Sequence, residues 1–153
     1  MLTLNAAGLF VTDIEKMVVF YRDVMGMETD WDGTPNAELH SGGLRLIMFP
    51  RREFEQMTKT PYTYPAGLNG TMEISFGLPT FEEVDREYER VVKAGAKPIF
   101  PPTDEPWGQR TSYVADPDGT LIEISSCNEG NAGSPETEQT QKGRPAASPF
   151  VTG

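Results

Sequence analysis

One pattern of strand and helix signals occurs twice along this chain of 153 residues. Each copy has a β-type run, a residue that can cap a helix, a stretch with helical spacing of apolar residues, and three further short runs with strand character. The first strand and helix cover 7–11 and 14–25, and the second cover 72–78 and 81–94. The sequence therefore predicts a duplicated β-α-β-β-β unit with an internal pseudo-twofold axis.

Six shorter runs complete the two copies. Each has strand character and is bounded by turn signals or by the end of a helix. They are 27–31, 37–40 and 44–49 in the first copy, and 97–100, 110–115 and 120–125 in the second. We expect one α+β domain over residues 1–127, with a first module at 3–50 and a second at 71–127.

Two segments lack the repeated pattern. Residues 51–70 connect the copies, are rich in Pro, Tyr and Thr, and show no clear periodicity. They are interpreted either as a plain linker or as a lid that folds over the sheet. Residues 128–153 form a low-complexity tail whose Gly, Pro, Ser, Thr and Gln cannot bury enough apolar surface to offset their ordering entropy. We expect this tail to be mobile.

Charge and cysteine content narrow the class of protein. A formal net charge of −10 disfavours nucleic acid and anionic lipid as partners and favours cationic small molecules. Cys127 is the only cysteine, which excludes an intrachain disulfide, and residues 1–5 lack the basic segment and apolar run of a signal peptide. No apolar run approaches the roughly 20 residues that span a bilayer. A cytoplasmic protein without a membrane partner is expected.

The stretch 110–125 predicts a tight β-hairpin. Its turn, Asp-Pro-Asp-Gly at 116–119, supplies a proline with preset φ and a glycine that is free to adopt positive φ. On the returning strand, Ile122 and Ile124 are apolar, so the two-residue period turns Glu123 to the opposite face. Glu123 is expected to point away from the hydrophobic core, into whatever the second face of the sheet encloses.

The same two-residue period assigns further side chains to the face that the helices leave open. In 44–49, Leu46 and Met48 suit the helix-covered face, and in 72–78 Ile74 and Phe76 do so. Polar and small residues alternate with them. The side chains expected on the open face are those of Ala6, Phe10, Glu38, His40, Arg45, Ile47, Phe49, Glu73 and Ser75, together with Gly8 and Gly77.

Taken together, the order and spacing of these motifs resemble the vicinal oxygen chelate superfamily, which includes glyoxalases, bleomycin-resistance proteins and extradiol dioxygenases. The motifs are Leu-Phe-Val-Thr-Asp at 9–13, Phe-Tyr-Arg-Asp-Val-Met-Gly-Met at 20–27, Ala-Gly-Ala at 94–96, and Asp-Pro-Asp-Gly at 116–119 followed by Ile122 and Glu123. The resemblance covers roughly residues 3–126. It implies paired βαβββ modules that curl into an incomplete, cup-shaped barrel, usually in a homodimer, with the ligand inside the cup.

The resemblance also bears on a metal site. Metal-dependent members carry imidazole and carboxylate ligands at four equivalent strand positions, which here look like Ala6, Ile47, Glu73 and Glu123. Only the two glutamates have donor atoms, a set better suited to hard cations. His40 is the only histidine, which excludes a site with two imidazoles. No resident metal and no other cofactor is predicted, and a loosely held divalent ion is the alternative.

Eight residues are the candidates for a ligand-binding site: Phe10, His40, Phe49, Glu73, Trp107, Arg110, Tyr113 and Glu123. Glu73 and Glu123 are either solvated carboxylates or a pair that holds a cationic group or acts as a base. His40 is either a surface residue beside a turn or a ligand contact. Trp107 either plugs the end of the barrel or stacks on a flat ligand near Arg110.

The predicted function is metal-independent sequestration of a drug-like or aromatic small molecule, preferably a cation, as in the bleomycin-resistance branch and antibiotic resistance. The alternative is a lyase, isomerase or epimerase of the glyoxalase type that uses Glu73 and Glu123 as acid and base. A homodimer is expected because half-barrel modules leave strand edges and apolar rims that a partner usually covers.

Overall fold

The computed structural model describes residues 1–127, and the tail predicted at 128–153 lies outside the described residues. The first half of the described chain contains β1 (Ala7–Val11), α1 (Ile14–Val19), the short π-helix η1 (Phe20–Val24), β2 (Ala37–Ser41) and β3 (Leu44–Pro50). The second half contains α2 (Arg51–Thr58), β4 (Asn69–Gly77), α3 (Phe81–Lys93), β5 (Lys97–Glu105), β6 (Gln109–Ala115) and β7 (Thr120–Ser126). This order agrees with a duplicated unit except at 27–31 and 51–58.

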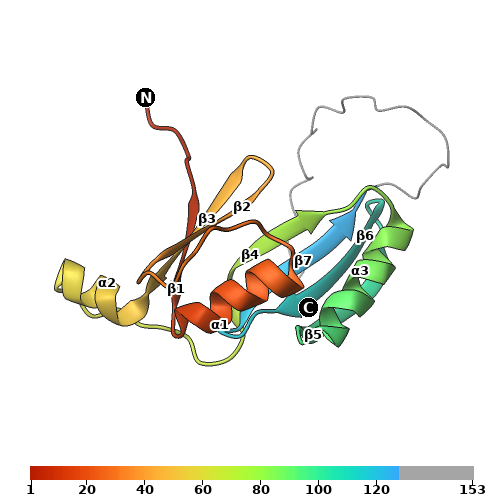
Figure 1. The fold of residues 1–153 in the computed structure, drawn as a ribbon. Coiled ribbons are helices and arrows are strands. Elements are labelled where there is room, and N and C mark those ends of the chain that lie inside the picture. Colours follow the sequence, from red (N-terminus) through yellow and green to blue (C-terminus); the bar gives the residue numbers. More distant parts are fainter. Residues whose placement is uncertain (128–153) are drawn as a thin grey trace.

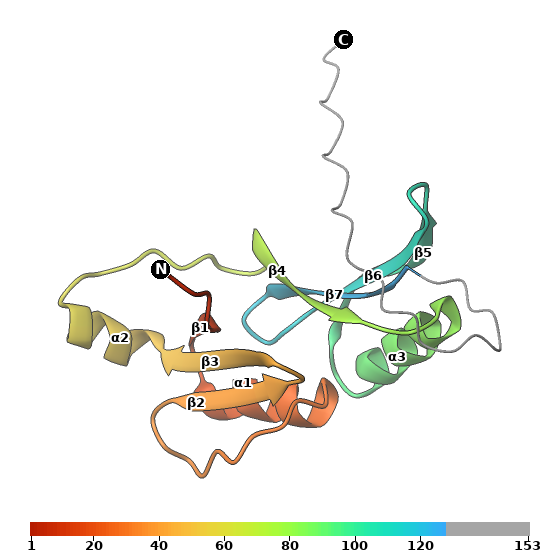
Figure 2. The same cartoon turned by 90° about the horizontal axis from the view of Figure 1, so that it is seen from above.

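The strands form two separate open sheets, one from each copy of the sequence pattern (Figures 1 and 2). Their strand orders are β1-β3-β2 and β4-β7-β6-β5. β1 is parallel to β3 and β4 is parallel to β7, whereas the other neighbours are antiparallel. α1 packs against β2 and β3, and α3 packs against β5, β6 and β7. The fold is α+β, as predicted, and over the described residues the sheets do not close into a barrel.

One cluster of buried apolar side chains extends through both modules. It includes alternate residues of the strands, such as Leu46 and Met48 in β3 and Ile122 and Ile124 in β7. Ile47, between the first two, is only half-buried. The strand parity expected from the sequence is therefore confirmed for these strands, and each sheet has one face against a helix and one open face.

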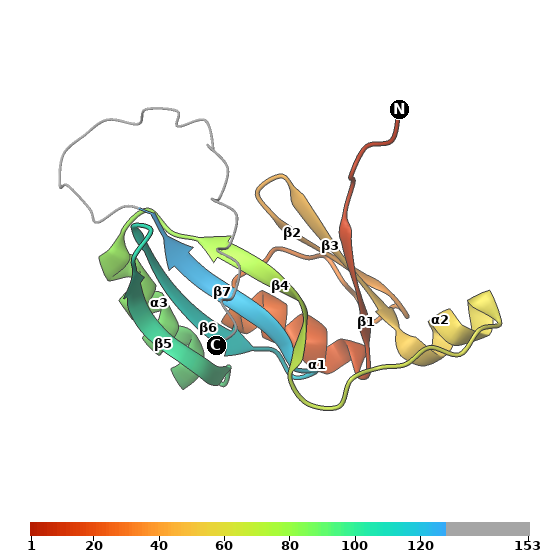
Figure 3. The same cartoon turned by 180° about the vertical axis from the view of Figure 1, so that it is seen from behind.

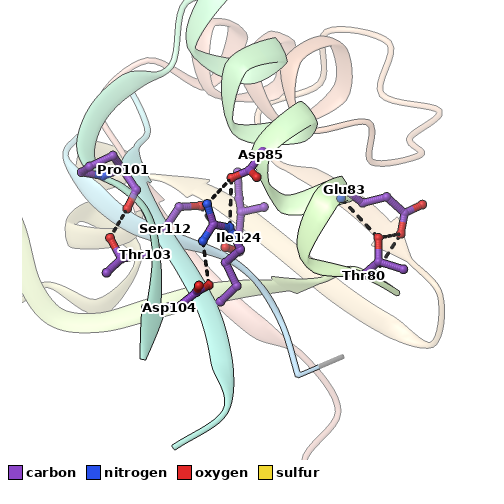
Figure 4. A network of polar contacts seen from close by, with 9 residues as sticks. Thr80, Glu83, Asp85, Pro101, Thr103, Asp104, Ser112 and Ile124 are labelled. Carbon is purple, nitrogen blue, oxygen red and sulfur yellow. Dashed lines mark hydrogen bonds and ion pairs between the residues drawn. The ribbon is translucent and has the colours of Figure 1, made fainter. Parts of the chain in front are cut away.

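Both main helices begin at the residues that the sequence indicates. The Asp13 carboxylate accepts a hydrogen bond from the Lys16 N–H at the start of α1. At the start of α3, Thr80 and Glu83 form a capping box, in which each side chain accepts a hydrogen bond from the other residue's backbone (Figure 4). None of the helices in the described part of the chain has the length and apolar character needed to cross a bilayer.

The strand predicted at 27–31 does not form. Its only sheet contact is a two-bond bridge in which Glu28 and His40 exchange backbone hydrogen bonds of 2.8 and 2.9 Å. Beyond it, local side chains hold the backbone, since the Thr29 hydroxyl donates to the Glu38 carbonyl and the Trp31 indole donates to the Thr34 carbonyl. These polar contacts compete with a strand ladder, so the first sheet has three strands where four were predicted.

A helix, α2, occupies part of the segment in which the sequence shows no periodicity. It follows directly on β3, and it projects away from the two sheets (Figure 1). None of its residues is buried, and its Phe54 ring stacks on Phe10 of β1 at 4.1 Å between ring centroids. The chain then returns through residues 59–68 to β4. Phe54 also contacts Phe49 of β3 edge-on, and the Arg51 guanidinium donates to the Phe10 carbonyl. Because none of the residues of this helix is buried, its sequence shows no apolar period.

The predicted hairpin at 116–119 is confirmed, and the turn also fixes the position of the linker. Gly119 has φ +87° and donates a backbone hydrogen bond to Asp116. A Cβ atom on Gly119 would lie 1.9 Å from the carbonyl oxygen of Gly67. The glycine is required both for the positive φ and for this close approach of the two backbones.

The same turn joins the two modules. The hydroxyl of Tyr21 in η1 donates a 2.8 Å hydrogen bond to the carboxylate of Asp116, and both side chains are buried. Asp116 also accepts hydrogen bonds from the backbone N–H groups of Asp118 and Thr120. The Asp118 carboxylate in turn accepts hydrogen bonds from the backbone N–H and the hydroxyl of Thr12. Burial raises the pKa of Asp116, and burial together with the nearby Asp116 carboxylate raises the pKa of Tyr21 well above 10.

Candidate functional site

Glu123 lies near the middle of β7, on the open face of the second sheet, and it is 5% exposed. Its Oε2 accepts a 2.6 Å hydrogen bond from the Ser75 hydroxyl on β4. Its Oε1 accepts hydrogen bonds from the Thr111 hydroxyl at 3.0 Å and from the Gln109 amide at 3.3 Å, both on β6. These donors are all neutral. The sheet thus holds a carboxylate in a fixed position without a cationic side chain among these contacts.

A tyrosine connects this carboxylate to a second one. The hydroxyl of Tyr113 on β6 donates to Glu73 Oε2 at 2.8 Å and lies 3.5 Å from Glu123 Oε1. Because a phenol carries one proton, the shorter contact to Glu73 is the stronger hydrogen bond. Glu73 on β4, Glu123 on β7 and Tyr113 on β6 are therefore brought together on three neighbouring strands.

Gln109 attaches Trp107 to the same cluster. Trp107 lies in the turn between β5 and β6 and is 56% exposed. Its indole N–H donates to the Gln109 side-chain oxygen at 2.8 Å, while the Gln109 amide nitrogen donates to Glu123. An indole can only donate, so the orientation of the Gln109 amide is determined by its two neighbours. Trp107 is thereby held at the edge of the acidic cluster. We name Glu73, Trp107, Gln109, Tyr113 and Glu123 the acidic face.

Arg110, in contrast, lies on the opposite face of β6. Its guanidinium donates to the Asp85 carboxylate of α3 at 2.8 and 3.0 Å and to Asp104 of β5 at 2.6 Å (Figure 4). These hydrogen bonds raise the pKa of Arg110. Arg110 precedes Thr111 on β6, and because neighbouring strand residues alternate between faces, its side chain points to the helix side of the sheet. The structure therefore separates Arg110 from the other candidate residues of this sheet.

Phe10 and Phe49 belong to a different group of side chains, on the first sheet. Both rings pack around Phe54 of α2, Phe10 stacked at 4.1 Å and Phe49 edge-on at 6.1 Å between ring centroids. Tyr62 also stacks on Phe54, at 5.0 Å between ring centroids. Phe10, Phe54 and Tyr62 also line a cleft of about 440 Å³ between β1, the linker and the start of β4. We name Phe10, Phe49, Phe54 and Tyr62 the aromatic group.

His40 stands in a third place, near the end of β2. Its Nε2 lies 3.2 Å from Glu38 Oε1, and Arg45 of β3 binds the same carboxylate through two hydrogen bonds of 2.7 Å. The hydrogen bonds from Arg45 lower the pKa of Glu38. His40 and Arg45 thus provide hydrogen-bond partners for the Glu38 carboxylate within the first sheet. These contacts do not connect His40 to the acidic face.

Some residues of these groups were not predicted as candidates, among them Thr111 and Gln109 on β6, Phe54 on α2 and Tyr62 in the segment that follows α2. A signal for the first two was present, because Gln109, Thr111 and Tyr113 alternate along one strand and share a face. Phe54 had no such signal, since the short helix that carries it shows no apolar period.

The sequence profile of the Glyoxalase/Bleomycin resistance protein/Dioxygenase superfamily matches residues 3–124. The chain belongs to this superfamily. The predicted membership of the vicinal oxygen chelate proteins is thereby confirmed, and it covers both modules.

Individual relatives agree with this assignment. The uncharacterized protein YraH of Bacillus subtilis strain 168 is 30% identical over 120 residues, covering 76% of this chain and 91% of YraH. A crystal structure of a glyoxalase/bleomycin resistance protein/dioxygenase from Nocardioides is 26% identical with a TM-score of 0.72, covering 89% of this chain and 91% of that one. A lactoylglutathione lyase from Agrobacterium tumefaciens is 21% identical with a TM-score of 0.63, covering 81% and 92%, and shows the fold alone.

Metal-dependent members of the superfamily raise the question of whether these residues fit a metal ion. The positions that the resemblance relates to metal ligands are Ala6, just before β1, and Ile47, Glu73 and Glu123, and the first two side chains have no donor atom. Both oxygens of Glu123 already accept hydrogen bonds from the protein. Among the described residues, no three His, Cys, Asp or Glu side chains are grouped so as to hold a metal. The donor set does not fit a tightly bound transition metal.

Proposed function

We propose that this superfamily member binds a small organic cation with a flat aromatic part on the acidic face, without a resident metal and without chemical change to the ligand. The observation that carries the proposal is the environment of Glu123. Within residues 1–127, the hydrogen bonds to this buried carboxylate come from neutral hydroxyl and amide groups, and a carboxylate in such surroundings keeps a strong preference for a positive charge nearby. This corresponds to sequestration of the bleomycin-resistance type.

The surroundings of Glu123 supply contact area for an aromatic ligand. The Trp107 ring is largely exposed and is held by its hydrogen bond to Gln109. The tryptophan side chain therefore loses little additional conformational freedom when a ligand covers it. Stacking on such a ring contributes roughly 0.5–1.5 kcal/mol beyond the area that is buried. The Tyr113 ring stands beside both carboxylates. A planar cation would therefore meet charge and flat apolar surface together.

Long-range charge supports the same ligand class. The net charge of −10 attracts cations to the whole protein, and this attraction weakens as salt screens it. A specific contact with Glu123 is buried and is screened much less. The salt dependence of binding thus separates general attraction from the contact at the acidic face.

The test is a titration of the protein with planar organic cations and, for comparison, with their neutral isosteres. Trp fluorescence and calorimetry measure the binding of each compound. Glu123→Gln should weaken binding of the cations at least tenfold and that of the neutral isosteres by less than twofold. Glu82→Gln is the matched control, because it removes the same charge from an exposed position on α3 that pairs with Arg86. Equal losses in both variants, or tight binding of neutral and anionic compounds alone, would contradict the proposal.

One observation favours a second candidate function, a lyase, isomerase or epimerase reaction. The Tyr113 hydroxyl contacts both Glu73 and Glu123, an arrangement through which a proton can pass between an acid and a base. In this case the bound compound would be converted, and Tyr113→Phe would remove turnover while leaving ligand affinity within about threefold. Product analysis by mass spectrometry after incubation with each bound compound distinguishes this function from sequestration.

A further inference from the structure

The cleft of about 440 Å³ beside Phe10 and Phe54 lies where the two modules meet. Its walls come from β1, the start of α2, the linker at 62–65, the first residues of β4 and the turn between β6 and β7. The linker runs back from α2, past β1, to the start of β4 (Figures 1 and 3). Among the residues that the structure describes, none from the acidic face lines this cleft. Its volume is within the roughly 300–1,000 Å³ that small-molecule sites have.

Two charged side chains, Arg51 and Asp118, contribute to the lining over the described part of the chain. The Asp118 carboxylate already has partners, because one oxygen accepts from the Thr12 N–H at 3.0 Å and the other accepts from the Thr12 hydroxyl. The Nη2 atom of Arg51 lies 3.9 Å from Asp118 Oδ2, which is too far for a hydrogen bond. Asp118 therefore attracts the guanidinium without using its hydrogen-bond donors.

The guanidinium of Arg51 is held in a fixed orientation. Its Nε donates a 3.0 Å hydrogen bond to the Phe10 carbonyl, and its Cζ lies 4.5 Å from the centroid of the Tyr64 ring. The side chain is 23% exposed. A guanidinium has five N–H donors, and within residues 1–127 the bond to Phe10 is the one that Arg51 makes. The two Nη groups are thus left for a planar acceptor, and a carboxylate matches them with two parallel hydrogen bonds.

Aromatic rings lie beside this cation. Phe10, Phe54 and Tyr62 form a stack with centroid distances of 4.1 and 5.0 Å and interplanar angles of 26° and 27°. The two outer rings of the stack, Phe10 and Tyr62, are each 42% exposed. All three line the cleft together with Arg51. Exposed aromatic faces next to a fixed guanidinium are suited to a ligand that has a flat ring and an anionic group.

We propose that this cleft is a second ligand site, which binds an aromatic monocarboxylate. The carboxylate lies on the Nη groups of Arg51, and the ring packs against Phe10 and Tyr62. A single negative charge is favoured because Asp118 lies near the guanidinium and repels a dianion more strongly than a monoanion. The site takes the opposite charge from the acidic face, so this proposal does not depend on the function proposed for that face.

Calorimetric titration of the whole chain with 2-naphthoate and its neutral isostere 2-naphthamide is the first test. We expect the naphthoate to bind at least tenfold more tightly than the naphthamide. Arg51→Gln should weaken naphthoate binding at least tenfold and naphthamide binding less than twofold. Arg52→Gln is the matched control, because it removes the same charge from the next residue of α2, which is exposed and does not line the cleft. Equal effects of the two variants, or no preference for the naphthoate, would overturn the proposal.

A second set of variants locates the compound. Arg51→Lys keeps the charge without the planar pair of donors and should weaken naphthoate binding three- to tenfold, which keeps the test valid if Arg51→Gln lowers stability. Tyr62→Ala should weaken the binding of both compounds by a similar factor of two to ten, because the ring contact is common to them. Glu123→Gln should leave naphthoate affinity within twofold. Full affinity in Arg51→Lys and Tyr62→Ala, or a tenfold change in Glu123→Gln, would show that the naphthoate lies elsewhere.

Discussion

The hydroxyl of Tyr21 donates a 2.8 Å hydrogen bond to the carboxylate of Asp116, which lies 95 residues further along the chain. Tyr21 belongs to the π-helix of the first module, and Asp116 opens the turn between β6 and β7 of the second. Both groups are buried, and the bond therefore forms only when the two modules are packed together. A wider helical turn at Phe20–Val24 is part of the local structure that brings the phenol to this position.

Removal of this hydroxyl should destabilise the folded protein without an effect on the acidic face. We expect Tyr21→Phe to lower the free energy of unfolding by about 1–3 kcal/mol, because a buried acceptor loses a partner. Tyr62→Phe, at an exposed ring, should change it by less than about 0.5 kcal/mol. Urea unfolding followed by circular dichroism measures both values, and equal effects of the two variants would contradict the structural role of the Tyr21 hydroxyl.

The same pair predicts a pH dependence of stability. Burial is the largest cause that raises the pKa of Asp116 in the folded state above its unfolded value of about 3.9. Between these two pKa values the folded chain binds more protons than the unfolded chain, so its stability decreases as pH rises through that interval. The stability contributed by protonated Asp116 is complete below pH 4 and is lost once the pH exceeds the folded pKa.

The comparison that isolates this effect uses Asp116→Asn, which cannot titrate. We expect the free energy of unfolding of the unchanged protein, relative to Asp116→Asn, to be largest near pH 4 and to decline toward neutral pH. Urea unfolding at intervals of half a pH unit measures the difference. A difference that grows with pH would mean that the folded state lowers the pKa of Asp116.

Arg110 offers a test of which face of the second sheet holds the ligand. Its guanidinium binds Asp85 and Asp104 on the helix side, and both carboxylates are partly exposed. Arg110→Gln should therefore lower the free energy of unfolding by only about 0.5–1 kcal/mol and should leave ligand affinity within twofold. Calorimetric titration and thermal unfolding of the same preparation supply both numbers. A tenfold loss of affinity with normal stability would place the ligand on the opposite face.

The hairpin, the helix caps and the face of Glu123 could be predicted because each depends on residues close together in sequence. Proline and glycine define the turn at 116–119, Thr80 and Glu83 lie three residues apart, and Glu123 alternates with two isoleucines. Such local rules act before any tertiary contact is made. For this reason the α+β fold and the position of one central carboxylate followed from the sequence alone.

The residues that surround this carboxylate could not be selected in the same way. Arg110 was grouped with Trp107 because the two are close in sequence, although strand alternation relative to Tyr113 indicates the opposite face. Gln109 joins Trp107 to Glu123 through hydrogen bonds that depend on the register of β6 against β7. Register between strands is a tertiary property, and the position of α2 likewise depends on contacts across the chain, such as those of Phe54 with Phe10 and Phe49.

Gln109 provides the last prediction, since it is the connection between the tryptophan and the carboxylate. The Gln109 side chain accepts from the Trp107 indole at 2.8 Å and donates to Glu123 at 3.3 Å. Gln109→Leu keeps a similar volume but makes neither bond, so the Trp107 ring should gain freedom and a ligand should lose the oriented surface. We expect lower fluorescence anisotropy of Trp107, measured in a Trp31→Phe background, and a three- to tenfold lower affinity for planar cations.

Gln109→Glu is the complementary variant, because its carboxylate can still accept a hydrogen bond from the Trp107 indole but repels the carboxylate of Glu123. That variant should keep the anisotropy of Trp107 and lose stability, and if both variants leave anisotropy and affinity unchanged, Trp107 is held independently of Gln109.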